Sequence, residues 1–137
     1  MGGSAKENYM EAMEQINQQL RRAGYVTHPN PKEKITGTKN TYVSAWKTPK
    51  GERILVLVRT QQTTGTAGQK VPFFILAIWD IFRQKRDIDR AYIVLCGDDT
   101  AWPLRPIFQD AAATLGGIRL RILPESEFTD SVRKQSL

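Results

Sequence analysis

Apolar side chains recur along this chain with two different periods, and the period predicts which segments are helices and which are strands. A recurrence every three or four residues predicts an amphipathic helix, whereas alternation or an unbroken apolar run predicts a strand. By this criterion we expect helices at residues 6–23, 69–86, 104–115 and 125–132, and strands at residues 41–47, 53–59, 91–96 and 118–123. Residues 26–39 are rich in Pro, Lys and Thr and are expected to form a loop with a short extended piece at most.

The order of these elements predicts the fold class. The sequence Thr-Pro-Lys-Gly at 48–51 is typical of a tight turn, so the first two strands should pair as an antiparallel hairpin. The later strands alternate with helices. The order α-β-β-α-β-α-β therefore predicts an α/β fold with a mixed β-sheet flanked by helices. With 137 residues and 40% apolar content, the chain should form one domain over residues 6–130. Residues 1–5 are interpreted as a tag or a disordered N-terminus, and residues 131–137 as a frayed tail.

Net charge is the compositional feature that bears most on function. The chain carries a formal charge of +6 and has a pI of about 9.7. This balance favours an anionic partner, either nucleic acid or an acidic protein surface, over no partner at all. Five lysines gather around the expected hairpin, at positions 32, 34, 39, 47 and 50. They fit a binding surface and a solvated basic face equally well.

Cysteine content and hydropathy bear on the compartment. Cys96 is the single cysteine, so no internal disulfide forms, and we expect an intracellular, reducing compartment such as the cytoplasm or an organelle matrix. The apolar run at 72–79 ends at Asp80, short of a membrane-spanning length, and the N-terminus carries no signal-peptide core. His28 is the single histidine, which argues against a structural zinc site. We expect no membrane contact and no bound metal.

One stretch of the chain resembles a nuclease superfamily. Residues 56–73 read Val-Leu-Val-Arg-Thr-Gln-Gln-Thr-Thr-Gly-Thr-Ala-Gly-Gln-Lys-Val-Pro-Phe. This stretch resembles part of the PD-(D/E)XK superfamily, in which a subset has a strand ending in Lys, a Gln-Gln, a Ser/Thr-Gly-Thr-Ala loop and a Lys-x-Pro helix start. Residues 90–97, Trp102 and residues 122–128 are similar to its closing strand, Gly-Trp turn and terminal strand-helix. The resemblance implies the restriction-endonuclease-like fold for roughly residues 37–128.

The resemblance also implies positions for catalytic groups, and this chain departs from the pattern at every one. The first acid corresponds to Thr41 or Asn40, and the second acid or Ser corresponds to Leu57. The Lys corresponds to Arg59, and the acid moved onto the helix corresponds to Gly68. Leu57 and Gly68 offer no side-chain ligand, and Arg59 does not lose a proton near neutral pH as a tuned lysine can. Because Mg²⁺ needs oxygen ligands in such a site, we expect no intact catalytic residue.

A polar and basic surface remains after the acids are lost. Hydroxyl groups, amides, cations and a helix N-terminus all suit phosphate oxygens. Trp46 alternates with Tyr42 and Ser44 on one strand face, so we expect its ring to be exposed and able to stack on a base. The expected nucleic-acid contacts are Lys39, Trp46, Lys47, Lys50, Arg59, Gln61, Gln62, Thr64 and Lys70.

Three functional hypotheses follow. The first is a catalytically degenerate nuclease-like domain that binds nucleic acid, with DNA favoured over RNA, as a binding or structural subunit of a nucleoprotein assembly or as a homodimer. The second is an active, Mg-dependent DNA endonuclease of the restriction or homing type, with a site rebuilt from Glu52, Asp98 and Asp99. The third is a structural subunit that binds only protein.

Overall fold

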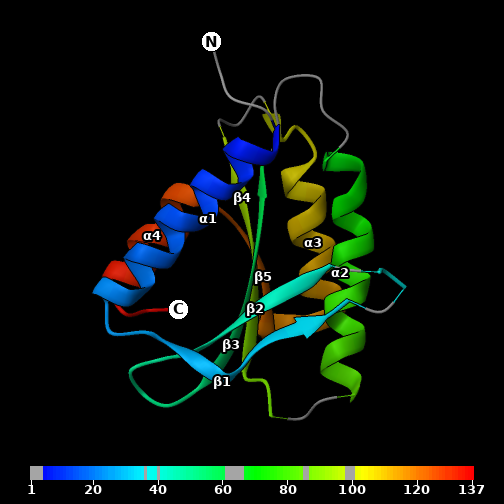
Figure 1. The fold of residues 1–137 in the computed structure, drawn as a ribbon. Helices are drawn as coiled ribbons and strands as arrows, with labels where there is room; N and C mark the ends of the chain where they lie inside the picture. The colour runs from blue at the N-terminus through cyan, green and yellow to red at the C-terminus, as the bar shows by residue number, and fades with distance from the viewer. Residues whose placement is uncertain (1–4, 36, 40, 61–66, 85–86, 98–100) are drawn as a thin grey trace.

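The structure, a computed structural model, contains one mixed sheet between helices (Figure 1). It describes residues 5–35, 37–39, 41–60, 67–84, 87–97 and 101–137, and for residues 5–7 and 67–69 the backbone alone. The elements are α1 (Ala5–Arg22), β1 (Val26–Lys34), β2 (Tyr42–Lys47), β3 (Arg53–Thr60), α2 (Ala67–Gln84), β4 (Arg90–Cys96), α3 (Arg105–Gly116), η2 (Gly117–Arg119), β5 (Leu120–Pro124) and α4 (Glu125–Arg133).

The strands lie in the order β1-β2-β3-β4-β5. Strand β2 pairs antiparallel with both β1 and β3, while β3, β4 and β5 run parallel to one another. The expected α/β fold with a mixed sheet flanked by helices is confirmed. No helix in the described ranges is both long enough and apolar enough to cross a lipid bilayer.

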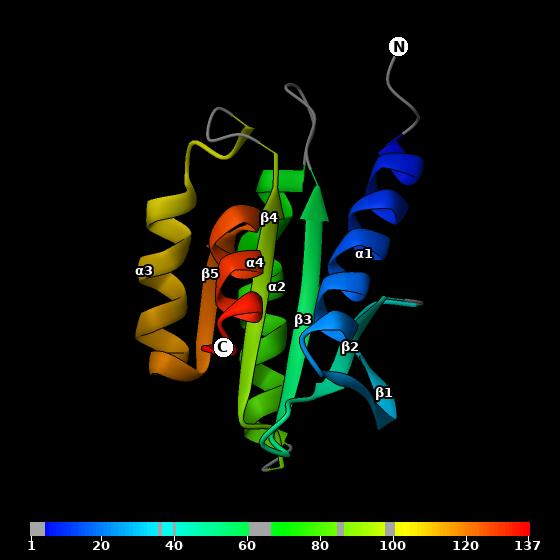
Figure 2. The same ribbon diagram turned by 90° about the vertical axis from the view of Figure 1, so that its left-hand side faces the viewer.

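Strand β3 lies at the centre of the sheet and is covered on both faces. Its apolar run is unbroken because alternate side chains enter two different cores. Leu55 and Leu57 pack with side chains of α2 and α3, whereas Ile54, Val56 and Val58 pack with side chains of α1 and α4. The protein therefore has three layers, with α2 and α3 on one face of the sheet and α1 and α4 on the other (Figures 1 and 2).

The expected helices are present, with shifted ends. Helix α1 buries Ile16 and Leu20 against the sheet, and Gly24, at a φ of 92°, follows its end as the stop signal predicts. Helix α2 begins at Ala67, two residues before the expected start, so Pro72 lies inside the helix and not in its first turn.

Residues 26–39 are the main departure from the expected fold. They contain the edge strand β1, which pairs with β2 and whose register shifts between Thr27 and Lys32. Pro29 and Pro31 fall within that shift, and proline, which donates no hydrogen bond, is typical of an edge strand. The composition that indicated a loop belongs to a strand that is paired on one side and largely exposed.

Residues 131–137, which we expected to fray, make contacts with the rest of the chain. Val132 is buried against the α1 side of the sheet. The Gln135 side-chain amide donates to the carbonyl oxygen of Ala23 at 3.0 Å, and Arg90 Nη2 donates to the carbonyl oxygen of Leu137 at 2.9 Å. The C-terminal residues therefore belong to the folded domain.

A buried arginine joins the edge strand to the centre of the sheet. Arg53, only 4% exposed at the start of β3, places Nη2 2.7 Å from a carboxylate oxygen of Glu33 on β1. Its Nη1 lies 3.2 Å from Asp87, and its backbone N–H donates to Asp89 at 2.9 Å. Because burying a charge without a partner is costly, the Arg53–Glu33 pair restricts where β1 can lie.

We predict that Arg53→Met lowers the free energy of unfolding by about 3–5 kcal/mol, because it removes one member of a buried ion pair. Urea denaturation followed by tryptophan fluorescence measures the change. The control is Arg83→Met, which breaks a contact of 3.8 Å between the exposed Arg83 and the half-buried Asp80 and should cost less than about 1 kcal/mol. Equal losses in the two variants would contradict a structural role for the buried pair.

Candidate nucleic-acid interface

The pairing register of β1 and β2 places four polar side chains on one face of their hairpin. Lys32 lies opposite Ser44, and Lys34 lies opposite Tyr42. Directly opposed residues point to the same side of a sheet, as do every second residue along a strand. We call the surface formed by Lys32, Lys34, Tyr42 and Ser44 the hairpin face.

The hairpin face lies on the α1 side of the sheet but beyond the cover that α1 provides. Val43, which points the other way, is buried in the core beneath α2. Tyr42 is 42% exposed, and both lysines of the face are exposed. The ammonium group of Lys32 lies 4.8 Å from the centroid of the Tyr42 ring, a cation–π contact. The face thus offers cations, a hydroxyl group and an aromatic ring to solvent.

Trp46 is buried, contrary to expectation. It lies on the same strand face as Tyr42 and Ser44, but it is only 3% exposed and packs with Ile54 in the α1-side core. The Arg21 guanidinium, at the end of α1, sits 5.7 Å from the centroid of its ring. Trp46 is therefore a core residue, and Tyr42 is the exposed ring of this strand.

The four lysines among the expected contact residues are exposed but distributed over several elements. Lys39 lies between β1 and β2, whereas Lys47 and Lys50 lie at the opposite end of β2, and Lys70 lies in the second turn of α2. With a rise of roughly 3.3 Å per residue, β2 separates Lys39 from Lys47 by more than one side-chain length. Gln61, Gln62 and Thr64 lie outside the described residues.

Arg59 is a half-buried cation at the carboxyl end of β3. Its guanidinium lies 4.6 Å from the centroid of the Phe74 ring on α2. Its Nε is buried and has no hydrogen-bond partner in the described part of the chain. Burial lowers the pKa of the Arg59 guanidinium from its ordinary value, yet arginine stays protonated in proteins. A partly desolvated cation held on an aromatic ring suits a phosphate or carboxylate ligand.

The positions that the nuclease resemblance assigned to acids have different surroundings. Leu57 is 2% exposed and lies in the core beneath α2. Thr41 precedes β2, which pairs with β3 from Ser44 onward, so Thr41 lies three residues beyond the last pair. Leu57 and Arg59 share one face of β3, while Asn40 lies outside the described residues. Gly68 lies in the first turn of α2.

Glu52 lies at the opposite end of β4 from Gly97. It adjoins the start of β4 through Arg90, whereas Gly97, the residue before Asp98, follows the end of β4. The length of β4 separates the two ends, and Asp98 and Asp99 themselves lie outside the described residues. Within the described ranges, no three His, Cys, Asp or Glu side chains gather in a group that could hold a metal ion.

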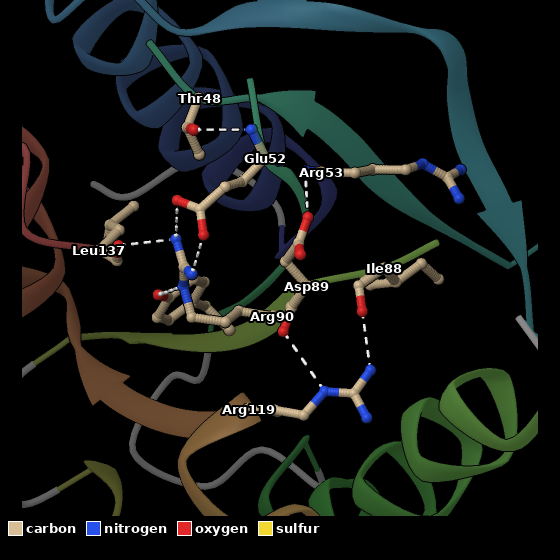
Figure 3. Close-up of polar contacts among 9 residues, drawn as sticks. Thr48, Glu52, Arg53, Ile88, Asp89, Arg90, Arg119 and Leu137 are labelled. Carbon is tan, nitrogen blue, oxygen red and sulfur yellow. Dashed lines mark hydrogen bonds and ion pairs between the residues drawn. The ribbon is translucent and has the colours of Figure 1, made fainter. Parts of the chain in front are cut away.

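A polar network that sequence reasoning missed stabilises the turn between β2 and β3 (Figure 3). Arg90 donates from Nη1 and Nη2 to the two carboxylate oxygens of Glu52 at 2.6 and 2.9 Å. The backbone N–H of Glu52 donates to Thr48 Oγ1 at 3.1 Å, which closes the turn. Arg119 Nη2 donates to the carbonyl oxygen of Ile88 at 2.7 Å just before β4. The sequence signalled this network only by placing charged residues beside apolar strands.

Comparisons with protein-family models, with curated proteins and with solved structures find no match. The similarity to PD-(D/E)XK nucleases therefore depends on the residues quoted for it, above all the stretch 56–73.

We predict that Glu52→Gln destabilises the protein near neutral pH and that this difference disappears in acid. The hydrogen bonds from Arg90 lower the pKa of Glu52 below its ordinary value of 4.5. Their stabilisation is therefore present above that ordinary pKa and is lost as the pH falls through the lower, folded-state value. Melting temperatures of wild type and variant across pH measure it, with Glu11→Gln on exposed α1 surface as the charge control. A pH-independent difference for Glu52→Gln would contradict the linkage.

We predict that Leu57→Glu destabilises the protein by several kcal/mol, on the order of 3 or more, because a carboxylate at this buried position has to be protonated or left unpaired. Thermal and urea denaturation measure the loss. Ile118→Glu, at a side chain that is 87% exposed, is the control and should melt near wild type. An unchanged melting temperature for Leu57→Glu would show that position 57 opens to solvent.

Proposed function

We propose that this protein binds nucleic acid through the hairpin face and Arg59, and that it does not cleave the strand it binds. The observation that carries the proposal is the hairpin face itself. Lys32, Lys34, Tyr42 and Ser44 point to one side through the register of β1 and β2, at the end of the hairpin that α1 leaves uncovered. Lysine and hydroxyl groups are common donors to phosphate and sugar oxygens.

Edge-strand protection is the competing explanation for these lysines. Lysines and prolines on an edge strand discourage pairing with a second sheet, and β1 has both. That explanation does not account for an exposed tyrosine ring beside them, since an aromatic side chain adds apolar surface to the edge. An aromatic ring next to cations is instead typical of surfaces that contact nucleic acid.

Arg59, whose side chain lies on the α2 face of the sheet and not on the α1 face with the hairpin face, supplies a second contact of the same chemistry. Its guanidinium is held by Phe74 at the carboxyl end of β3, immediately before the segment that leads to the N-terminus of α2. The chain's formal charge of +6 adds a long-range attraction for a polyanion. DNA is favoured over RNA because the nuclease superfamily that residues 56–73 resemble acts on DNA.

We expect no cleavage because residues without a carboxylate occupy the positions of the nuclease acids. Leu57 is part of the core beneath α2, and a leucine side chain has no oxygen with which to hold Mg²⁺. We infer a restriction-endonuclease-like domain whose catalytic positions are degenerate. The inference is supported by residues 56–73 and by the element order β2-β3-α2, in which a helix follows the antiparallel pair.

We predict that the double change Lys32→Gln with Lys34→Gln weakens binding to DNA of any sequence and flattens its salt dependence. Each lost phosphate contact should reduce the slope of log K against log salt by roughly 0.7–0.9. Fluorescence anisotropy with a labelled duplex at several salt concentrations measures both quantities. Adding Arg59→Gln should flatten the slope further.

The matched control removes two exposed cations elsewhere, with Arg121→Gln on β5 and Lys134→Gln after α4. It should change the slope less than the hairpin pair does. Absence of salt-dependent binding by the wild type, or equal losses in the two double variants, would contradict the proposal and favour a protein-binding subunit. Cleavage with millimolar Mg²⁺ or Mn²⁺ that is lost in Asp98→Ala with Asp99→Ala would favour the endonuclease hypothesis.

A further inference from the structure

An apolar surface lies on the outer side of α2 and α3, away from the hairpin face. Phe73 and Leu76 on α2 are 44% and 54% exposed, and Leu104 and Ile107 at the start of α3 are 51% and 62% exposed. Each pair is three residues apart and so lies on one side of its helix. Helices α2 and α3 pack together on the same face of the sheet (Figures 1 and 2). We call these four residues the α2–α3 patch.

The α2–α3 patch contains four large apolar side chains, and its α2 half carries no charge, while Arg105 follows Leu104 in the α3 half. Single exposed apolar side chains are ordinary, but several large ones on neighbouring helices indicate an interaction surface. Between Lys70 and Asp80, helix α2 reads Val-Pro-Phe-Phe-Ile-Leu-Ala-Ile-Trp, with no ionisable residue. Two copies of a chain with a charge of +6 repel one another. This repulsion is smallest when the copies meet through an uncharged surface such as this one.

We propose that a second copy of this chain covers the α2–α3 patch, so that the protein forms a homodimer about a two-fold axis. The charges that flank the patch favour this occupant. Lys70 and Asp80 are ten residues apart, roughly 15 Å along the helix. When two α2 helices pack antiparallel about residue 75, Lys70 of each copy faces Asp80 of the other, which in its own helix is 3.8 Å from Arg83 and accepts a hydrogen bond from Gln84. A two-fold axis forms that pairing twice from a single helix sequence.

The size of the patch also suits such a dimer. Four half-exposed large side chains supply a few hundred Å² of apolar surface, on the order of the hydrophobic centre of a standard interface that buries about 800 Å² per copy. The exposed polar residues around α2 and α3 complete the rim. This pairing assigns Lys70 to the dimer contact, whereas the sequence had placed it among the nucleic-acid contacts.

The first test is the mass of the protein in solution without nucleic acid. Sedimentation or light scattering from low to high micromolar concentration should show the mass of the 15.5 kDa chain rising to twice that value. Leu76→Asp should raise the dissociation constant of the dimer by about tenfold or more, because it places a charge in the contact. Ile118→Asp, at an apolar side chain that is 87% exposed outside the patch, should leave the mass unchanged.

The second test is a charge exchange between the two flanking residues. Lys70→Glu alone should weaken the dimer by placing two carboxylates opposite each other, and adding Asp80→Lys should restore it. Circular dichroism confirms that each variant is folded. A wild type that stays monomeric at every concentration, a mass unaffected by Leu76→Asp, or a double variant that does not recover the dimer would each overturn the proposal.

Discussion

The burial of β3 on both faces is the constraint from which the rest of the structure follows. Five consecutive apolar residues from Ile54 to Val58 are almost fully buried, so each face of this strand needs its own covering layer. Helices α2 and α3 cover one face, and α1 and α4 cover the other. Strand β4 pairs parallel with β3, and its residues Ala91–Cys96 are also buried, so β4 needs a covering layer on each face as well. A three-layer domain is the consequence.

The candidate functional surfaces lie where this covering stops. Helix α1 covers the hairpin at Trp46 and leaves Tyr42 and Ser44 open, so the same strand face is core at one end and surface at the other. Arg59 follows the buried part of β3, at the edge where the sheet gives way to the segment before α2. The outer sides of α2 and α3 face away from the sheet altogether. Binding surfaces at such edges can change without disturbing the two cores.

The period of the apolar residues was enough to predict the central elements, because burial on one or two faces leaves a strong signal in the sequence. It was not enough for β1, which buries almost nothing and whose prolines and lysines are also those of a loop. Alternation placed Trp46 on the correct strand face. Whether a face is covered depends on the position of α1, which alternation does not reveal.

The polar contacts were the least predictable part. Arg53 flanks an apolar strand in the same manner as the exposed cations do, and only the tertiary fold brings it to Glu33, twenty residues earlier in the chain. The ion pair between Arg90 and Glu52 likewise joins residues 38 positions apart. Of the nine contacts expected from the sequence, Trp46 is instead buried in the core. The exposed side chains of the hairpin face are Tyr42, Lys32 and Lys34, which were not among the nine.

The position of bound nucleic acid on the protein tests the central claim most directly. Amide chemical shifts of the labelled protein, followed by NMR during titration with a short DNA duplex at low salt, locate the contact residue by residue. The account predicts the largest changes at Lys32, Lys34, Tyr42 and Arg59, with little change along α4. Shifts concentrated on α4 or on the outer sides of α2 and α3, or no shifts at all, would contradict it.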